Sequence, residues 1–325
     1  MISYLLFLLF SILLAASNAV ISNHDSLTRL VYQFPNLTRI ENVAVRSNGH
    51  LLLSMLTQPE LRSINPLDPT PEPSLVYQFP NSTSVFGIAE IEPDIFAVVA
   101  GNLSFPPNNF AIWMVNHRKR VPEVRKAANI PAGGILNGLA RLSHNTVLGS
   151  DILAGVIYRI NLDTGDSSIA VQDETMKSPV ALPGFGVNGI RIHGRYLYYV
   201  NIGKGLFCRI PINLRTGTAN SPVEIISDLV QGADDFALSK TGQTAYIANL
   251  LQNSLVRVAA DGEVKVIAGG PDGALFIGPT SAQLGRTPLD REVVYVVSSG
   301  AVFNPSTGGF DSVEGGKIVA VKVYD

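Results

Sequence analysis

The chain has 325 residues, with 24 Lys and Arg against 26 Asp and Glu, so its formal net charge is -2. This balance excludes a protein that binds nucleic acid through bulk positive charge. With 46% hydrophobic and only 15% charged residues, the composition also excludes an intrinsically disordered chain. The 29 Gly and 20 Pro indicate many turns between short elements.

The N-terminal residues predict a secretory signal peptide. Tyr4 to Ala16 form an almost unbroken apolar run, and Ser17-Asn18-Ala19 is a small-residue site suited to cleavage after Ala19. The alternative is a retained membrane anchor, which needs about 20 apolar residues, more than this run provides. We therefore expect residues 1–19 to be removed and residues 20–325 to form one domain without a membrane span. The protein is then secreted or stays in the lumen of the secretory pathway.

Three acceptor sequences for N-glycosylation agree with passage through that pathway. They begin at Asn36, Asn81 and Asn102. Cys208 is the only cysteine, so no internal disulfide can form. Its strand-like surroundings predict a buried, inert thiol.

An internal repeat indicates the architecture. The hexapeptide Val31–Asn36 recurs without change as residues 76–81. A second marker, usually a small polar or acidic residue before a short apolar strand, recurs along the chain. The copies begin at Glu41-Asn42-Val43, Phe86-Gly87-Ile88, Asn137-Gly138-Leu139, Asn188-Gly189-Ile190, Asp235-Phe236-Ala237 and, less clearly, Thr280-Ser281-Ala282. Repeats with a period of about 20–50 residues are typical of solenoids and propellers.

Each copy has room for four short strands, which is the anatomy of a propeller blade. No long stretch shows the helical period of 3.6. The segment Leu27–Phe34 resembles Leu75–Phe79, the fourth strand of the first copy. We therefore expect it to complete the last blade and close the ring. The predicted fold is an all-β, six-bladed propeller.

The residues that begin the copies should converge in space, because the innermost strands of a propeller line its central channel. Glu41, Asn137, Asn188 and Asp235 are oxygen donors at this repeat position. Two carboxylates and two amide carbonyls form a hard-oxygen set suited to Ca²⁺ or Mg²⁺. No motif indicates an organic cofactor, a catalytic triad or a phosphate loop.

A second set of polar residues ends the β-rich runs of the copies. Its members are Ser54, Asn102, Asp151, Asn201, Asn249 and Ser298. The pattern predicts one shared polar face. For any single residue the alternative is a structural role, because Asn and Asp also cap turns and bind nearby backbone groups.

Apolar residues are expected beside this polar set. Phe86 replaces the polar residue in the second copy and is predicted to wall an apolar pocket, as are Met55 and Phe303.

The repeat motifs resemble those of a known superfamily. They are Ile40–Gly49, Asn137-Gly138-Leu139, Asn188-Gly189-Ile190, Ala233–Phe236 and Gly278–Ala282. They are similar to fungal secreted propellers of the senescence-marker/gluconolactonase/strictosidine-synthase-like superfamily. In the gluconolactonase branch one Glu, two Asn and one Asp hold a divalent cation, and the resemblance carries these roles to Glu41, Asn137, Asn188 and Asp235. The metal there polarises a lactone carbonyl while an Asp manages the proton, a part that Asp151 or Asp234 would take here.

The fungal subgroup also resembles the hetero-Diels–Alderases of tropolone–sesquiterpenoid pathways. The resemblance implies that a quinone methide is generated or held and joined to a humulene-type alkene in an apolar, preorganised cavity. On this interpretation Asp151, Asn188 and Asp235 take part in the chemistry. Substrate contacts are expected from Phe86, Asn137, Asn201, Asn249 and Ser298.

Three functions therefore stay open. The first, which the resemblance implies, is a cyclase of secondary metabolism that acts on a small hydrophobic natural product. The second is a metal-dependent lactonase or related hydrolase. The third is a non-catalytic secreted propeller that binds a ligand or a partner.

Overall fold

The computed structural model describes residues 27–103, 106–130, 134–272 and 275–324. The predicted signal peptide lies outside these residues. Nearly all described elements are strands, joined by turns and two short 3-10 helices, Glu174–Met176 and Leu250–Gln252. Within the described ranges no helix is long and apolar enough to span a membrane.

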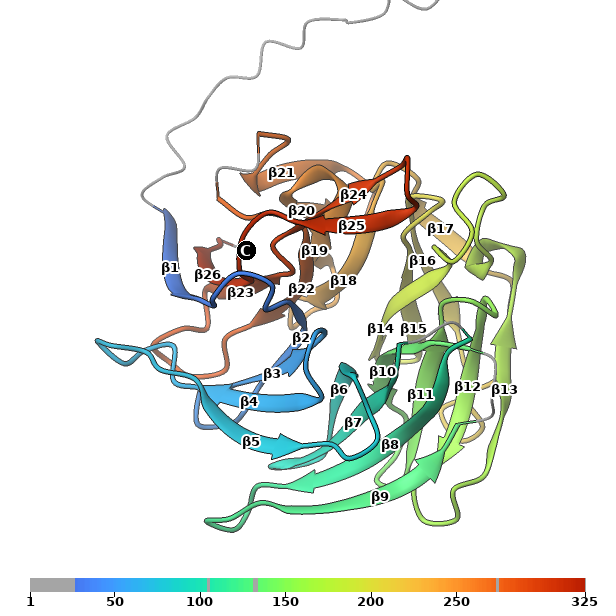
Figure 1. Ribbon diagram of the computed structural model, residues 1–325. Helices are drawn as coiled ribbons and strands as arrows, with labels where there is room; N and C mark the ends of the chain where they lie inside the picture. The colour runs from blue at the N-terminus through green and yellow to red at the C-terminus, as the bar shows by residue number, and fades with distance from the viewer. Residues whose placement is uncertain (1–26, 104–105, 131–133, 273–274, 325) are drawn as a thin grey trace, which may run out of the picture.

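The strands form six four-stranded antiparallel sheets around a central axis, which confirms the predicted six-bladed propeller (Figure 1). From the axis outward, the first three sheets are β2 (Ile40–Val45), β3 (Leu51–Met55), β4 (Glu60–Ile64), β5 (Ser74–Gln78); β6 (Ser84–Glu92), β7 (Ile95–Asn102), β8 (Asn108–Asn116), β9 (Glu123–Asn129); and β10 (Leu136–Arg141), β11 (Thr146–Asp151), β12 (Val156–Asn161), β13 (Ser167–Gln172). The next three are β14 (Val187–His193), β15 (Tyr196–Asn201), β16 (Leu206–Pro211), β17 (Glu224–Ser227); β18 (Ala233–Leu238), β19 (Thr244–Asn249), β20 (Ser254–Ala259), β21 (Val264–Gly269); and β22 (Pro279–Leu284), β23 (Val293–Ser298), β26 (Lys317–Lys322), β1 (Thr28–Gln33).

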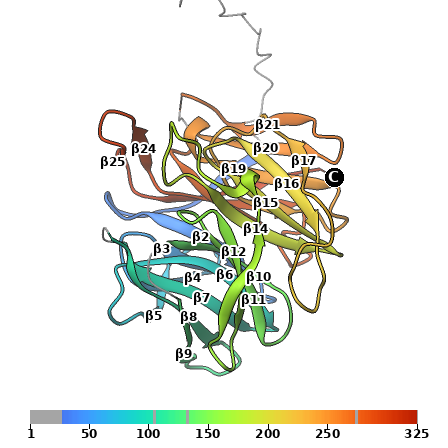
Figure 2. The ribbon, with the colours of Figure 1, turned by 90° about the vertical axis from the view of Figure 1, so that its right-hand side faces the viewer.

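The sixth sheet draws its strands from both ends of the described chain. β1 pairs antiparallel with β26, from Thr28 opposite Val321 to Gln33 opposite Lys317. A separate hairpin, β24 (Ala301–Asn304) and β25 (Gly309–Ser312), is inserted between β23 and β26. It projects from one face of the ring (Figure 2).

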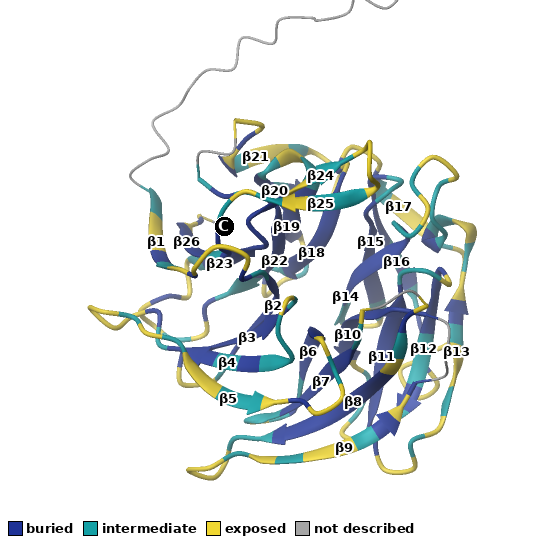
Figure 3. Ribbon diagram, in the orientation of Figure 1, coloured by how far each residue is buried: buried dark blue, intermediate teal, exposed yellow. Residues whose placement is uncertain are grey.

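Neighbouring blades are held together by apolar side chains. Between the sixth and first sheets, Val31, Tyr295 and Ile318 pack with Ile40 and Leu51, and none is more than 6% exposed. Similar clusters occupy the other interfaces. The inner and middle strands are therefore buried, whereas the outermost strand of each blade is largely exposed (Figure 3).

The predicted modification sites occupy the surface to different degrees. Asn36 and Asn81 are exposed, whereas Asn102 is half-buried and accepts a hydrogen bond from the Thr83 hydroxyl at 3.3 Å. Cys208 is fully buried, and this burial raises the pKa of its thiol to about 12. The cysteine therefore belongs to the core of the fourth blade.

The inner strands approach one another so closely that three of them need glycine at one position. A Cβ on Gly87 would lie 2.3 Å from the carbonyl oxygen of Asn137, and one on Gly138 would lie 2.7 Å from that of Asn188. A Cβ on Gly189 would lie 2.6 Å from the Cα of Asp235. This contact explains the recurring dipeptides that end in glycine. It also fixes the spacing of the side chains that precede each glycine.

We expect Gly138→Ala to lower the free energy of unfolding by about 1–3 kcal/mol, because the new methyl group must push two backbones apart. Gly270→Ala is the matched control. Its Cβ would meet nothing closer than 3.8 Å, and its backbone is not in the left-handed region. Denaturant unfolding of both variants tests the prediction, and equal losses would contradict it.

Candidate functional site

Six inner-strand residues at one register position form a ring at the mouth of the channel. Each stands just where the pairing of its strand with the second strand of the blade becomes irregular. The ring consists of Glu41, Phe86, Asn137, Asn188, Asp234 and Thr280. All six are more than nine-tenths buried and line one cavity of about 230 Å³.

The polar side chains of this mouth ring are linked in pairs. The Asn137 Nδ2 donates to the Glu41 Oε1 at 3.0 Å, and the Asn188 amide donates to Asp234. The Asn188 Oδ1 is buried and accepts no hydrogen bond from the described residues. A buried acceptor without a partner is costly, so this oxygen is available to a ligand.

Burial raises the pKa of both carboxyl groups of the mouth ring. Desolvation raises the pKa of Glu41 to about 7, with a further upward contribution from the charge of Asp235. The same causes, with Glu41 added, raise the pKa of Asp234 well above its ordinary value. Two neighbouring acids in an apolar site thus resist double ionisation. The arrangement suits proton transfer near neutral pH.

Asp235 was predicted to belong to this ring, but its neighbour Asp234 takes that place. The pairing of Ala233 with Asn249 matches that of Val187 with Asn201, which makes Asp234 the equivalent of Asn188. Asp235 occupies the place of Gly189 one layer deeper. Its Oδ2 accepts hydrogen bonds from three side chains that cross the channel: Asn42 at 2.9 Å, Ser281 at 3.0 Å and Arg191 at 2.8 Å.

The second predicted polar set does not line the cavity. Four members do occupy equivalent places at the ends of second strands: Asp151, Asn201, Asn249 and Ser298. In the first two blades this place is held by Met55 and Ala100, where Ser54 and Asn102 were expected.

The side chains of this set mostly bind backbone groups. Asp151 accepts from the amides of Leu153 and Ala154, Asn201 donates to the carbonyls of Thr175 and Lys177, and Ser298 accepts from the Lys317 amide. Only Asn249 leaves its Oδ1 without a donor among the described residues. The structural role that was the alternative therefore describes Asp151, Asn201 and Ser298, whereas no such bond is found for the Asn249 Oδ1 within the described part of the chain.

The residues that follow this set form the cavity wall, which the sequence analysis missed. Leu56, Ile152, Ile202 and Leu250 come directly after the second-strand ends or their equivalents and line the cavity. The signal was present in the sequence, because an apolar residue stands at the same place in four copies. Phe86 lines the cavity as predicted, whereas Met55 lies in the blade core.

The inserted hairpin covers part of the cavity with aromatic rings. Phe303 of β24 and Phe310 of β25 lie with ring centroids 5.3 Å and 6.2 Å from that of Phe185. Phe185 and Phe310 line the cavity, and Phe303 packs against both. Arg39, which precedes β2, donates to the Phe310 carbonyl at 2.9 Å and to the Ser312 hydroxyl at 2.8 Å. Arg39 therefore ties the hairpin to the channel mouth.

The mouth ring fits a hard divalent cation in part. Glu41 and Asp234 supply carboxylates, and the unpartnered Asn188 Oδ1 supplies a neutral oxygen, which are the ligand types of Ca²⁺ and Mg²⁺. No three His, Cys, Asp or Glu side chains gather as a metal cluster anywhere in the described part of the chain. A cation would have to compete with the proton that the two acids hold.

Comparisons with known proteins agree with this architecture. No family model matches the chain. It is 30% identical over 322 residues to a protein named hetero-Diels-Alderase asR5 from Sarocladium schorii, covering 85% of this chain and 79% of that protein. It is 26% identical over 305 residues to a protein named hetero-Diels-Alderase from Phoma sp, covering 83% and 86%. Regucalcin from Agrobacterium tumefaciens, a calcium-binding protein, has a TM-score of 0.65 at 14% identity over 91% of this chain and 95% of its own, which shows the shared fold.

The raised pKa of Glu41 predicts how stability depends on pH. Its folded pKa of about 7 exceeds the ordinary value of 4.5, so between these values the folded chain holds more protons than the unfolded chain. The free energy of unfolding must then fall as pH rises through this window. We expect Glu41→Gln to flatten the decline of the thermal midpoint between pH 5 and pH 8. Glu92→Gln, an exposed acid paired with Arg118, is the control and should keep the wild-type slope.

The hydrogen bonds of Arg39 predict the stability of the hairpin. Charged hydrogen bonds contribute about 1.5–3 kcal/mol each when intact, so Arg39→Ala should speed amide exchange in residues 301–312 by about tenfold or more. Arg62→Ala is the control. It removes an arginine that pairs with Glu60, two residues away on β4. Unchanged exchange in the hairpin would show that aromatic packing alone holds it.

Proposed function

The chain belongs to the hetero-Diels-Alderase family, and we propose that it couples a quinone-methide-type polyketide to a terpene alkene in the cavity at the channel mouth. Family membership makes the chain an enzyme, a pericyclase of secondary metabolism. The observation that carries the proposal is an apolar cavity whose floor holds two neighbouring acids with raised pKa values.

The walls of the cavity suit two apolar reactants. Leu56, Phe86, Ile152, Phe185 and Phe310 surround the mouth ring. Holding diene and alkene together in such a space removes the entropic cost of their encounter, which can contribute about 7–11 kcal/mol. Cycloaddition requires no nucleophile.

The hydroxyl groups of the cavity are already engaged. Thr280 donates to the carbonyl of Ile40 at 3.0 Å, and Ser299 donates to that of Gly278 at 3.1 Å. No cysteine, histidine or lysine lines the cavity among the described residues. This composition supports a pericyclic reaction over covalent catalysis by a side chain.

The acid pair can generate the reactive diene. One carboxyl group, on Glu41 or Asp234, donates its proton to the hydroxyl of a hydroxymethyl-substituted enol, and the carbon–oxygen bond breaks as water leaves. The other member, as carboxylate, accepts the enol O–H proton. The products are one neutral quinone methide and one water, and the pair still holds one proton. That remaining carboxyl group can donate a hydrogen bond to the oxygen of the diene, which then forms one C–O and one C–C bond with the alkene.

A metal-dependent lactonase is the second candidate, and the unpartnered Asn188 Oδ1 favours it. Glu41, Asp234 and this oxygen would hold Ca²⁺ or Mg²⁺, which supplies Lewis-acid polarisation of a carbonyl when bound. A cation requires both acids to be ionised, whereas the cyclase requires one to stay protonated. The two functions therefore demand opposite states of the same residues.

The cellular setting follows from the N-terminal sequence. We propose that the enzyme acts in the secretory pathway or outside the cell, supported by the signal-peptide pattern of residues 1–19. Its substrate is a small hydrophobic natural product.

The test is a coupling assay with purified protein, a hydroxymethyl tropolone and a humulene-type alkene, followed by chiral chromatography. Product should form faster and with higher stereoselectivity than without protein. Glu41→Gln should lower turnover by about 10²–10⁴-fold, because it removes an acid that moves a proton, while Glu92→Gln leaves turnover unchanged.

Chelation separates the two candidates. If the cyclase is correct, EDTA leaves coupling intact. Coupling no better than the background, together with lactone hydrolysis that EDTA abolishes, would replace the cyclase by the lactonase.

A further inference from the structure

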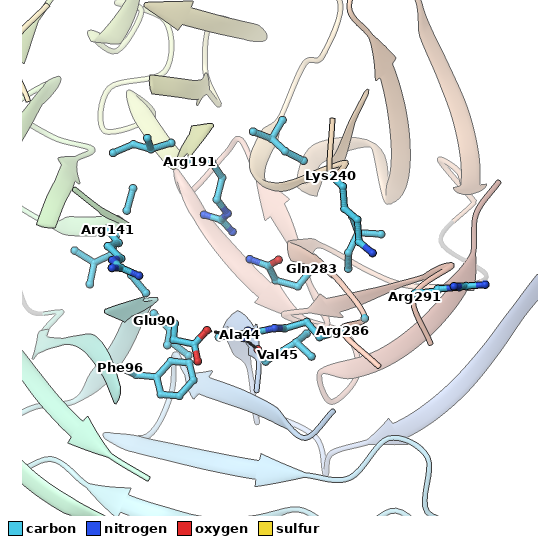
Figure 4. A pocket seen from close by; sticks show the side chains of 18 of the residues that line it. Ala44, Val45, Glu90, Phe96, Arg141, Arg191, Lys240, Gln283, Arg286 and Arg291 are labelled. Atoms are coloured by element: carbon cyan, nitrogen blue, oxygen red, sulfur yellow. Dashed lines mark hydrogen bonds and ion pairs between the residues drawn. The ribbon is translucent and has the colours of Figure 1, made fainter. Parts of the chain in front are cut away.

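A second, larger cavity lies at the opposite end of the channel from the mouth ring. Its volume is about 760 Å³, and all six inner strands contribute to its lining near their C-terminal ends. It shares none of its lining residues with the mouth cavity. Figure 4 shows that Arg141, Arg191 and Gln283 project into this opening from three different strands.

Small side chains make this lower cavity deep. At one register position the six inner strands carry Arg191, Gln283 and four alanines, Ala44, Ala89, Ala140 and Ala237. Because alanine side chains are short, space remains around the channel axis. The cavity extends along this space to Arg191 and Gln283, which form its inner end, here called the floor.

The floor presents hydrogen-bond donors that the described residues do not use. The two terminal nitrogens of Arg191 bind the carbonyl of Ile190 and the carboxylate of Asp235, but its Nε has no acceptor. The amide of Gln283 has no hydrogen-bond partner among the described residues.

The rim of the cavity adds positive charge. Arg141 and Lys240 are exposed and form no ion pair with any described residue, and Arg291 at the outer edge is likewise unpaired. Arg286 is neutralised by Glu90, and Glu292 is the one further acid in the lining. This excess of cations stands out in a chain whose formal net charge is -2. A concave site with one sign of charge concentrates ions of the opposite sign.

We propose that the lower cavity binds a small organic anion with carboxylate or phosphate groups. Arg141 and Lys240 meet its charge at the rim, and Arg191 and Gln283 donate to its inner end. Phe96, Ile88 and Leu139 provide apolar contact for its carbon body. The site is separate from the coupling chemistry proposed at the mouth.

Calorimetric titration of the full chain with citrate, and separately with pyrophosphate, tests the site at constant ionic strength. We expect saturable binding of one anion per chain, and the tighter probe identifies the preferred group. Arg141→Gln/Lys240→Gln should weaken binding by about tenfold or more, since two charged contacts to the anion are lost.

The control carries the same change of charge elsewhere. Arg215→Gln/Lys265→Gln removes two exposed cations on outer elements, whose side chains form no ion pair within the described chain. It should bind the probe as wild type does. Absence of saturable binding to either probe, or equal weakening in both double variants, would overturn the proposal. Coupling at the mouth should be unaffected by Arg141→Gln/Lys240→Gln, so failure of this site and failure of the proposed function remain distinguishable.

Discussion

The close approach of six strands to one axis is the constraint on which the molecule depends. Three strands meet it with glycine, at Gly87, Gly138 and Gly189, where any side chain would strike a neighbouring backbone or the side chain of Asp235. The other three carry polar residues in the same layer, and two of these, Asn42 and Ser281, donate to the third, Asp235. The layer is therefore asymmetric, with glycines in three adjacent blades and polar side chains in the other three. Its glycines let blades two to five pack tightly, and its polar side chains fill the channel from the opposite side.

This polar layer gives the mouth ring its chemistry. Asp235 lies beneath Glu41 and Asp234, and its negative charge adds to the desolvation that raises the pKa of both acids. Its own charge is stabilised by Arg191 and by the two neutral donors. A fixed, compensated charge below two desolvated acids favours their protonated forms. Asp235 was predicted to be a ligand or a catalytic group. In the structure its carboxylate binds three side chains, and its charge contributes to the raised pKa values of the two acids above it.

The repeat alone was enough to predict the blades, because each copy contains alternating apolar strands and turn residues. It could also have decided between Asp234 and Asp235. Glycine follows Phe86, Asn137 and Asn188, so the residue in the glycine layer of the fifth copy is the second acid, and Asp234 belongs to the ring. The hairpin of residues 301–312 could not be predicted in this way, since it departs from the repeat. Side chains such as Asn201 were misjudged because a turn residue and a substrate contact are identical in sequence.

The ion pair between Asp235 and Arg191 also separates the mouth ring from the lower cavity. Their side chains, with those of Asn42 and Ser281, cross the channel between the two cavities. Under the proposed function, reactants would therefore arrive and product would leave on the side of the mouth ring. On that side the rings of Phe185 and Phe310 border the cavity, and Arg39 holds their hairpin in place. The proposed product is larger than either reactant, so its release would need more space beside this hairpin than binding does. If the chain couples two reactants as proposed, the contacts that Arg39 and Phe185 make with the hairpin, including its Phe303 and Phe310, would set the balance between holding the reactants together and releasing their product.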